Sequence, residues 1–258
     1  MNNKFIIFFI ITAALVIGFT PVSAYASGNT LVPRVEVSFG GTDDPEGVVP
    51  ALQVLFIVTI IALAPSILLL LTGFTRIIVT MHFIRAAMGT QQMPPNQVMV
   101  GISLILTFFL MGPILTEINE NALQPFSGGQ ITMEEAISRG MEPLSKFMRD
   151  QAERRDVELF ISLSGEEFES VDDIPDRIII PAFVLGELTK GFIMGFVIYL
   201  PFIVIDMVVA SVLMDMGMMM LPPAMISMPF KILIFLLTGG WSFVLSYIID
   251  SFRVVTTT

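Results

Sequence analysis

Four apolar segments dominate the pattern of hydrophobic and polar positions along this 258-residue chain. The first carries no charged residue, and about 20 apolar residues are enough for a helix to cross a bilayer. The pattern therefore predicts apolar helices. Proline lacks the backbone donor that a helix interior needs, so we expect a kink at Pro65 and a break at Pro201. The segments are 49–72, 98–115, 181–214 and 229–249.

The segments pair into hairpins on either side of a polar region, which predicts an all-α membrane protein. Residues 49–115 form the first hydrophobic helical hairpin and 181–253 the second, with an acidic helical region at 116–180. The connection at 73–97 has two arginines and no acid, so the positive-inside rule places it on the cytoplasmic side. Residues 116–177 carry 15 acidic and 6 basic side chains, and we expect them across the membrane, outside the cytoplasm.

The polar region contains the signals of an amphipathic helix. Thr132 followed by Glu135 matches a capping box, which predicts a helix start. Apolar residues then recur at helical spacing and predict a face that packs on a partner subunit or on the chain's own bundle. The face consists of Leu144, Phe147, Met148 and Ala152.

The N-terminus has the pattern of a signal peptide over residues 1–26. Lys4 supplies the positive start, an apolar stretch follows, and Ala24 and Ala26 form a small-residue cleavage box. Cleavage after Ala26 would leave a mature chain that starts outside the cytoplasm. Residues 27–48 are predicted to be an extracytoplasmic tail, because they are rich in glycine, proline and acidic residues.

Composition narrows the class of protein. Hydrophobic residues make up 54% of the chain and charged residues 14%, with a mean hydropathy of +0.83. A soluble domain carries about 25% charged residues, so this is an integral membrane protein. With one histidine and no cysteine, the chain offers no thiolate or histidine metal site and no triad for catalysis, which argues against an enzyme. A pI near 4.5 argues against nucleic-acid binding.

The third apolar segment contains ionisable residues that need a partner. Each costs at least ~2.5 kcal/mol in a bilayer unless it is paired or hydrated, which makes Glu187 and Asp206 candidate functional residues. Glu187 and Lys190 stand three residues apart and could neutralise each other. Gly191 and Gly195 form a small face that favours close approach of another helix. The fourth segment carries Lys231 near its start.

A methionine-rich stretch connects the third and fourth segments. Eight of the 18 methionines lie between Met207 and Met228, and Pro222 and Pro223 end the densest part. Three interpretations remain open at this point: a turn packed in a helix bundle, a Cu(I) path with M-x-x-x-M spacing, and a compliant seal around a pore. The densest part contains Met216, Met218, Met219 and Met220.

Short motifs of specific residues lie within and around these features. In the second half they are Pro181-Ala182-Phe183, Glu187-Leu188, Gly191-Phe192, Gly195, Pro201-Phe202, Asp206, Ala210-Ser211, Gly217-Met218-Met219-Met220, Pro222-Pro223, Phe230-Lys231 and Gly240-Trp241. In the first half and the polar region they are Phe74-Thr75-Arg76, Pro94-Pro95-Asn96-Gln97-Val98, Pro143-Leu144 and Phe147-Met148. Over roughly residues 48–253 the chain thus resembles the FliP family of flagellar type III export-gate proteins, called SctR in injectisomes. Gly186 and Ile193 depart from the polar residues usual in that family.

The resemblance implies a subunit of a homopentameric ring in the bacterial inner membrane, at the flagellar basal body. Its partners would be FliQ and FliR, with FlhB and FlhA of the export apparatus, and its cargo unfolded flagellar proteins. The methionines at 216, 218, 219 and 220 would form the gasket of the pore. Glu187 and Lys231, together with Asp206, match charged family positions that are buried at subunit contacts. The resemblance also implies hairpins that are largely lifted out of the membrane plane.

Two other functions are kept as alternatives. A Cu(I) transporter would use the methionines as ligands, and a proton-coupled small-solute transporter would use Glu187 and Asp206. The sequence does not decide between a flagellum and an injectisome, nor does it identify the cargo.

Overall fold

A computed structural model describes residues 45–90, 93–168, 170, 173–218 and 221–253. The predicted signal peptide, with Ala24 and Ala26, and nearly all of the predicted tail lie outside these residues. The chain divides into two compact units between Phe56 and Ile57, within the first described helix, and the following description concerns the second unit.

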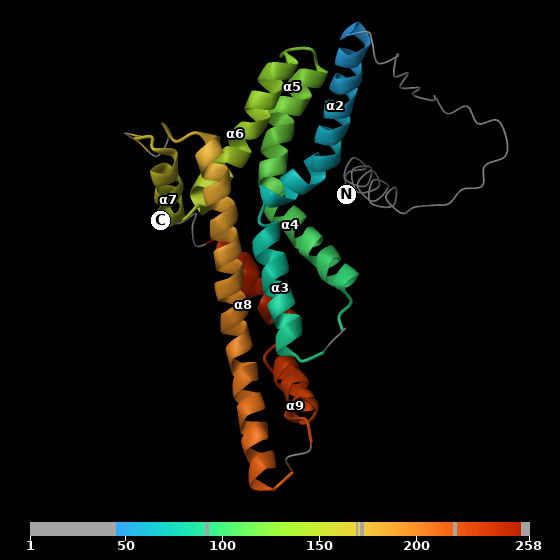
Figure 1. Cartoon of the computed structure of the whole chain (residues 1–258), viewed down its shortest axis with the longest axis vertical. Helices are drawn as coiled ribbons and strands as arrows, with labels where there is room; N and C mark the ends of the chain where they lie inside the picture. Colours follow the sequence, from blue (N-terminus) through green and yellow to red (C-terminus); the bar gives the residue numbers. More distant parts are fainter. Residues whose placement is uncertain (1–44, 91–92, 169, 171–172, 219–220, 254–258) are drawn as a thin grey trace, which may run out of the picture. The chain divides into compact units, whose positions relative to one another are not determined.

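The described residues form helices and no strand, which confirms the predicted all-α class (Figure 1). The most apolar helices correspond to the predicted segments, and shorter amphipathic helices fill the polar region. In chain order the elements are α2 (Pro45–Leu70), α3 (Phe74–Ala87), α4 (Asn96–Ile118), the π-helix η1 (Asn119–Leu123), α5 (Gln124–Ser127), α6 (Met133–Gln151), α7 (Arg154–Ser164), α8 (Asp176–Asp215), α9 (Pro223–Leu237) and α10 (Trp241–Arg253).

Helix α8 is longer and less interrupted than its sequence predicted. It runs for 40 residues through both Pro181 and Pro201, so the expected break at Pro201 is wrong. A proline removes one backbone hydrogen bond, but apolar surroundings offer the backbone no other partners, which favours keeping the remaining helical bonds.

The fourth predicted segment, by contrast, is two helices. Helices α9 and α10 meet at 63°, and the bend falls at Gly239 and Gly240, whose φ angles are +95° and +54°. These positive φ values suit glycine, which has no Cβ to clash in that region. A similar bend of 68° separates α2 from α3 at residues 71–73, and α2 itself continues through Pro65, where the kink stays a prediction.

Two helices, one at residues 96–127 and one at 176–215, are long and apolar enough to cross a membrane. If each bent pair, α2 with α3 and α9 with α10, counts as one span, there are up to four among the described residues. This agrees with the membrane character that the composition predicted.

Helix α3 packs along α8 on the glycine face, as predicted (Figure 1). A Cβ at Gly191 would lie 3.2 Å from the Arg76 backbone, and one at Gly195 would lie 2.5 Å from the Phe83 ring. The hydroxyl of Thr80 also donates to the backbone oxygen of Gly191 at 3.3 Å. Glycine therefore sets the distance between the two helices.

The polar region folds against the first third of α8. The Thr132 hydroxyl accepts from the Glu135 backbone N–H at 3.3 Å, which confirms the predicted start of α6. On the predicted apolar face, Met148 is fully buried, and the Phe147 ring meets the Phe183 ring of α8 edge to face. The amphipathic helix thus packs on the chain's own bundle.

A first prediction tests the close approach of α3 and α8. We expect Gly195→Ala to destabilise the protein by about 1–3 kcal/mol, because the new methyl group would collide with Phe83. Gly101→Ala in α4 is the matched control, since no atom lies within 4 Å of its added Cβ, and it should stabilise by about 0.5–1 kcal/mol. Thermal unfolding in detergent measures both, and equal shifts for the two variants would contradict the packing.

Candidate functional site

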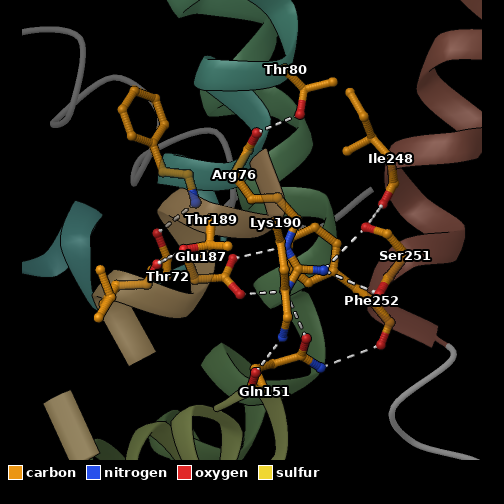
Figure 2. A network of polar contacts seen from close by, with 12 residues as sticks. Thr72, Arg76, Thr80, Gln151, Glu187, Thr189, Lys190, Ile248, Ser251 and Phe252 are labelled. Carbon is orange, nitrogen blue, oxygen red and sulfur yellow. Dashed lines mark hydrogen bonds and ion pairs between the residues drawn. The ribbon is translucent and has the colours of Figure 1, made fainter. Parts of the chain in front are cut away.

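The most connected polar group in the described part of the chain is the guanidinium of Arg76, in the first turn of α3. It forms a fork with the carboxylate of Glu187, in which Nε donates to Oε2 at 3.0 Å and Nη2 donates to Oε1. The two side chains are 1% and 0% exposed. Figure 2 shows this pair enclosed by helices α3, α6, α8 and α10.

The other donors of Arg76 reach two further helices. Nη2 donates to the side-chain oxygen of Gln151 at 2.9 Å, and Nη1 donates to the backbone oxygen and the hydroxyl of Ser251, both at 3.1 Å (Figure 2). The ring of Phe252 covers the guanidinium, with 3.8 Å between its centroid and the central carbon. We name Arg76, Glu187, Gln151, Lys190, Ser251 and Phe252 the Arg76 cluster.

Arginine suits this position because its rigid fork matches a carboxylate and still leaves donors for other partners. Breaking a buried ion pair by removing one partner costs about 3–5 kcal/mol, since the remaining charge is stranded. Gln151 closes the arrangement by donating from its amide to the backbone oxygen of Phe252 at 3.3 Å. The cluster therefore fixes the last residue of α6 and the last turn of α10 against α3 and α8.

Sequence reasoning identified Glu187 but missed its partner. The alternative of an internal pair with Lys190 is not what the structure has, because the Lys190 ammonium donates to the backbone oxygen of Gln151 at 2.5 Å. The usable signal was an unpaired carboxylate in one apolar segment and an isolated arginine at the start of another helix. Spacing along the chain could not join them, since 111 positions separate the two residues.

The contact between Arg76 and Gln151 joins two regions that were expected on opposite sides of the membrane. The positive-inside rule placed residues 73–97 across the membrane from 116–177, yet Arg76 bonds directly to the end of α6. The rule concerns solvated charges in loops, whereas Arg76 is buried and paired. At this arginine, therefore, the two regions are in direct contact, and the sides of the membrane on which they lie stay a prediction.

Lys231 and Asp206 form a second, separate ion pair between α9 and α8. The Lys231 ammonium donates to Asp206 Oδ2 at 2.7 Å, and the Ser227 hydroxyl donates to Oδ1 at 2.5 Å. The Lys231 side chain is 5% exposed and that of Asp206 is 35% exposed. Glu187 and Lys231 thus each have a partner on a neighbouring helix of the same chain, and they are not paired with each other. Their predicted place at subunit contacts stays a prediction.

The methionine-rich stretch lies where α8 turns back into α9, at the far end of α8 from the polar region (Figure 1). Helix α8 ends at Asp215, and Gly217 has a φ of +73°. Met216 is 65% exposed and Met218 is 40% exposed. Met219 and Met220 lie outside the described residues.

Next to this turn, α8 and α9 enclose an apolar groove of about 550 Å³. No polar atom contributes to its lining surface. Its lining includes Val208, Val212, Met216, Ile226, Phe230 and Ile234. The turn and the groove therefore offer soft apolar contacts, with Asp215 at the end of α8 as the charged residue next to the turn and the Asp206 pair further back.

A second prediction concerns the two ion pairs. We expect Glu187→Ala, and to a smaller degree Lys231→Ala, to destabilise the protein, with roughly 3–5 kcal/mol lost for the fully buried Glu187. Both variants should also fail to appear on native gels in the ring that the sequence resemblance implies. The control is Glu158→Ala, whose ion pair with Arg154 is exposed and should contribute less than about 1 kcal/mol. Normal assembly and stability of Glu187→Ala would show that the pair is hydrated.

The FliP family model matches residues 57–248. Flagellar biosynthetic protein FliP of Bacillus subtilis (strain 168) is 45% identical over 217 residues, which are 84% of this chain and 98% of the relative. That of Pectobacterium carotovorum subsp. carotovorum is 46% identical over 203 residues, 78% of this chain and 79% of the relative. That of Aquifex aeolicus (strain VF5) is 40% identical over 226 residues, 86% of this chain and 92% of the relative. A family match over most of the length, with relatives at these identities, shows that this chain belongs to the FliP family.

Proposed function

We propose that this chain is the pore-forming subunit of a flagellar-type protein export gate, which passes unfolded flagellar proteins out of the cytoplasm. In this proposal several copies form a ring, with five copies expected from the family. FliQ and FliR complete the gate, and FlhB and FlhA of the export apparatus adjoin it. The assembly belongs to the inner membrane at the base of the flagellum.

The observation that carries the proposal is the apolar hairpin of α8 and α9 with its methionine turn. In the most apolar window of α8, only 11% of the residues are buried. Exposed side chains line several sides of the helix, among them Phe192, Phe196, Val204, Val208 and Val212. Apolar surface of this extent requires a cover of lipid or of other subunits. A ring supplies such a cover through repeated contacts between copies.

The methionine turn suits a gate because an export channel has opposing demands. It must pass a chain of any sequence, and it must hold ions back when idle. A ring of apolar side chains can exclude ions by dewetting. Methionine is unbranched and adaptable, so its side chain can re-pack around a passing chain. In the proposed ring, the residues at 216 and 218–220 of each copy meet at the pore axis.

A third prediction tests the seal. We expect Ala in place of Met216, Met218 and Met219 to raise the ion conductance of the idle pore and to leave assembly of the complex intact. The reason is that a smaller apolar plug stays wet and leaks. Conductance across the membrane and native-gel assembly should be measured on the same variant.

The control replaces Met207 and Met225, which are similarly exposed at 66% and 67% but lie in the flanking helices. This pair should not change the idle conductance. If the triple variant assembles and its idle conductance equals that of the unmodified protein, the seal hypothesis is wrong. Loss of stoichiometric copper binding in the triple variant, without a leak, would favour the Cu(I) alternative instead.

A further inference from the structure

Asp156, in the first turn of α7, is a buried carboxylate without a full set of partners. Its side chain is 4% exposed, and Oδ1 accepts a long bond of 3.4 Å from Arg155 Nε. Oδ2 is out of contact with solvent and has no hydrogen-bond partner among the described residues. A charged oxygen in that state is unfavourable unless a cation or donor can reach it.

The open oxygen faces α8 at Gly186. A Cβ on Gly186 would stand 3.2 Å from Asp156 Oδ2 and 3.8 Å from the backbone nitrogen of Glu153. Lys190 lies one turn further along the same face of α8. Side chains on a helix slant toward its N-terminus, so we expect the stem of Lys190 to run back toward Gly186. With no side chain at Gly186, nothing on that residue separates the stem from Asp156.

Besides Arg155, whose side chain is 73% exposed, the ammonium of Lys190 is a second cation near this carboxylate. It now donates to the backbone oxygen of Gln151 at 2.5 Å. The charges of Glu187, Glu153 and Asp156 attract it, and Arg76 repels it. Lysine carries three donors on a flexible four-carbon stem, so it can change acceptors without moving the backbone. The two acceptors belong to different elements, because Gln151 ends α6 and Asp156 begins α7.

We propose that Lys190 exchanges between the Gln151 carbonyl and the Asp156 carboxylate, and so acts as a two-position latch between α8 and the α6–α7 pair. In one position the end of α6 is tied to α8, and in the other the start of α7 is tied. The exchange holds both polar helices to α8 while letting each loosen in turn. This inference stands on Asp156, Gly186 and Lys190 and does not depend on the export function.

The fourth prediction tests the latch by hydrogen exchange on the full-length chain in lipid nanodiscs. Asp156→Asn removes the charge that competes for Lys190, so the lysine should stay on Gln151. Backbone amides at the start of α7, such as that of Val157, should then exchange roughly threefold to tenfold faster. Those at the end of α6, such as that of Ala152, should exchange more slowly. A purely structural role for Asp156 would loosen both segments, which would overturn the proposal.

The dependence on Lys190 gives the second part of the test. In a Lys190→Met background, Asp156→Asn should no longer slow exchange at the end of α6, because the two residues act as one unit. Lys190→Arg keeps the cation, so in that background Asp156→Asn should again slow exchange at the end of α6. This variant is used for the test if Lys190→Met does not accumulate. Asp150→Asn, an exposed acid near the end of α6, is the matched control. Additive effects of the Asp156 and Lys190 changes would also overturn the latch.

Discussion

A carboxylate buried in an apolar helix bundle requires a cation, and at Glu187 that cation is Arg76. This requirement of Glu187 for a cation explains much of the fold. It draws the first turn of α3 against α8, which is possible because Gly191 and Gly195 leave room for the approach. The remaining donors of the arginine then hold the end of α6 and the end of α10. Four helices, distant in sequence, thereby share one electrostatic centre.

The apolar segments, the capped start of α6 and its buried face were predictable, because each depends on neighbouring residues in the sequence. The partner of Glu187 was not, since it is set by tertiary packing. The effects of proline and glycine on where helices end were predicted wrongly. Pro201 is tolerated inside α8, while Gly239 and Gly240 turn the chain between α9 and α10. A helix can continue past one missing donor, whereas two adjacent residues with positive φ lie outside the right-handed helical region and end it.

Family membership confirms the prediction of a non-enzymatic flagellar membrane protein. The structure adds that the two ends of α8 have different surroundings. Its first third is wrapped by amphipathic helices and carries Glu187, while its last third is mostly apolar, contacts α9 and leads into the methionine turn. The Asp206 pair ties α9 to α8 short of the turn. The polar contacts of α8 are thus concentrated at its polar end and at Asp206, and exposed methionines lie at its tip.

The length of α8 gives this arrangement mechanical leverage. A continuous helix of 40 residues measures about 60 Å, roughly twice the hydrocarbon thickness of a bilayer. About 42 Å separate Glu187 from the C-terminal end at Asp215. A tilt of about 5° around the Arg76 cluster would therefore move the tip sideways by about 4 Å, close to the reach of a methionine side chain. A small change in the angle of α8 at the Arg76 cluster is thus converted into a displacement of the methionine turn that is as large as a side chain.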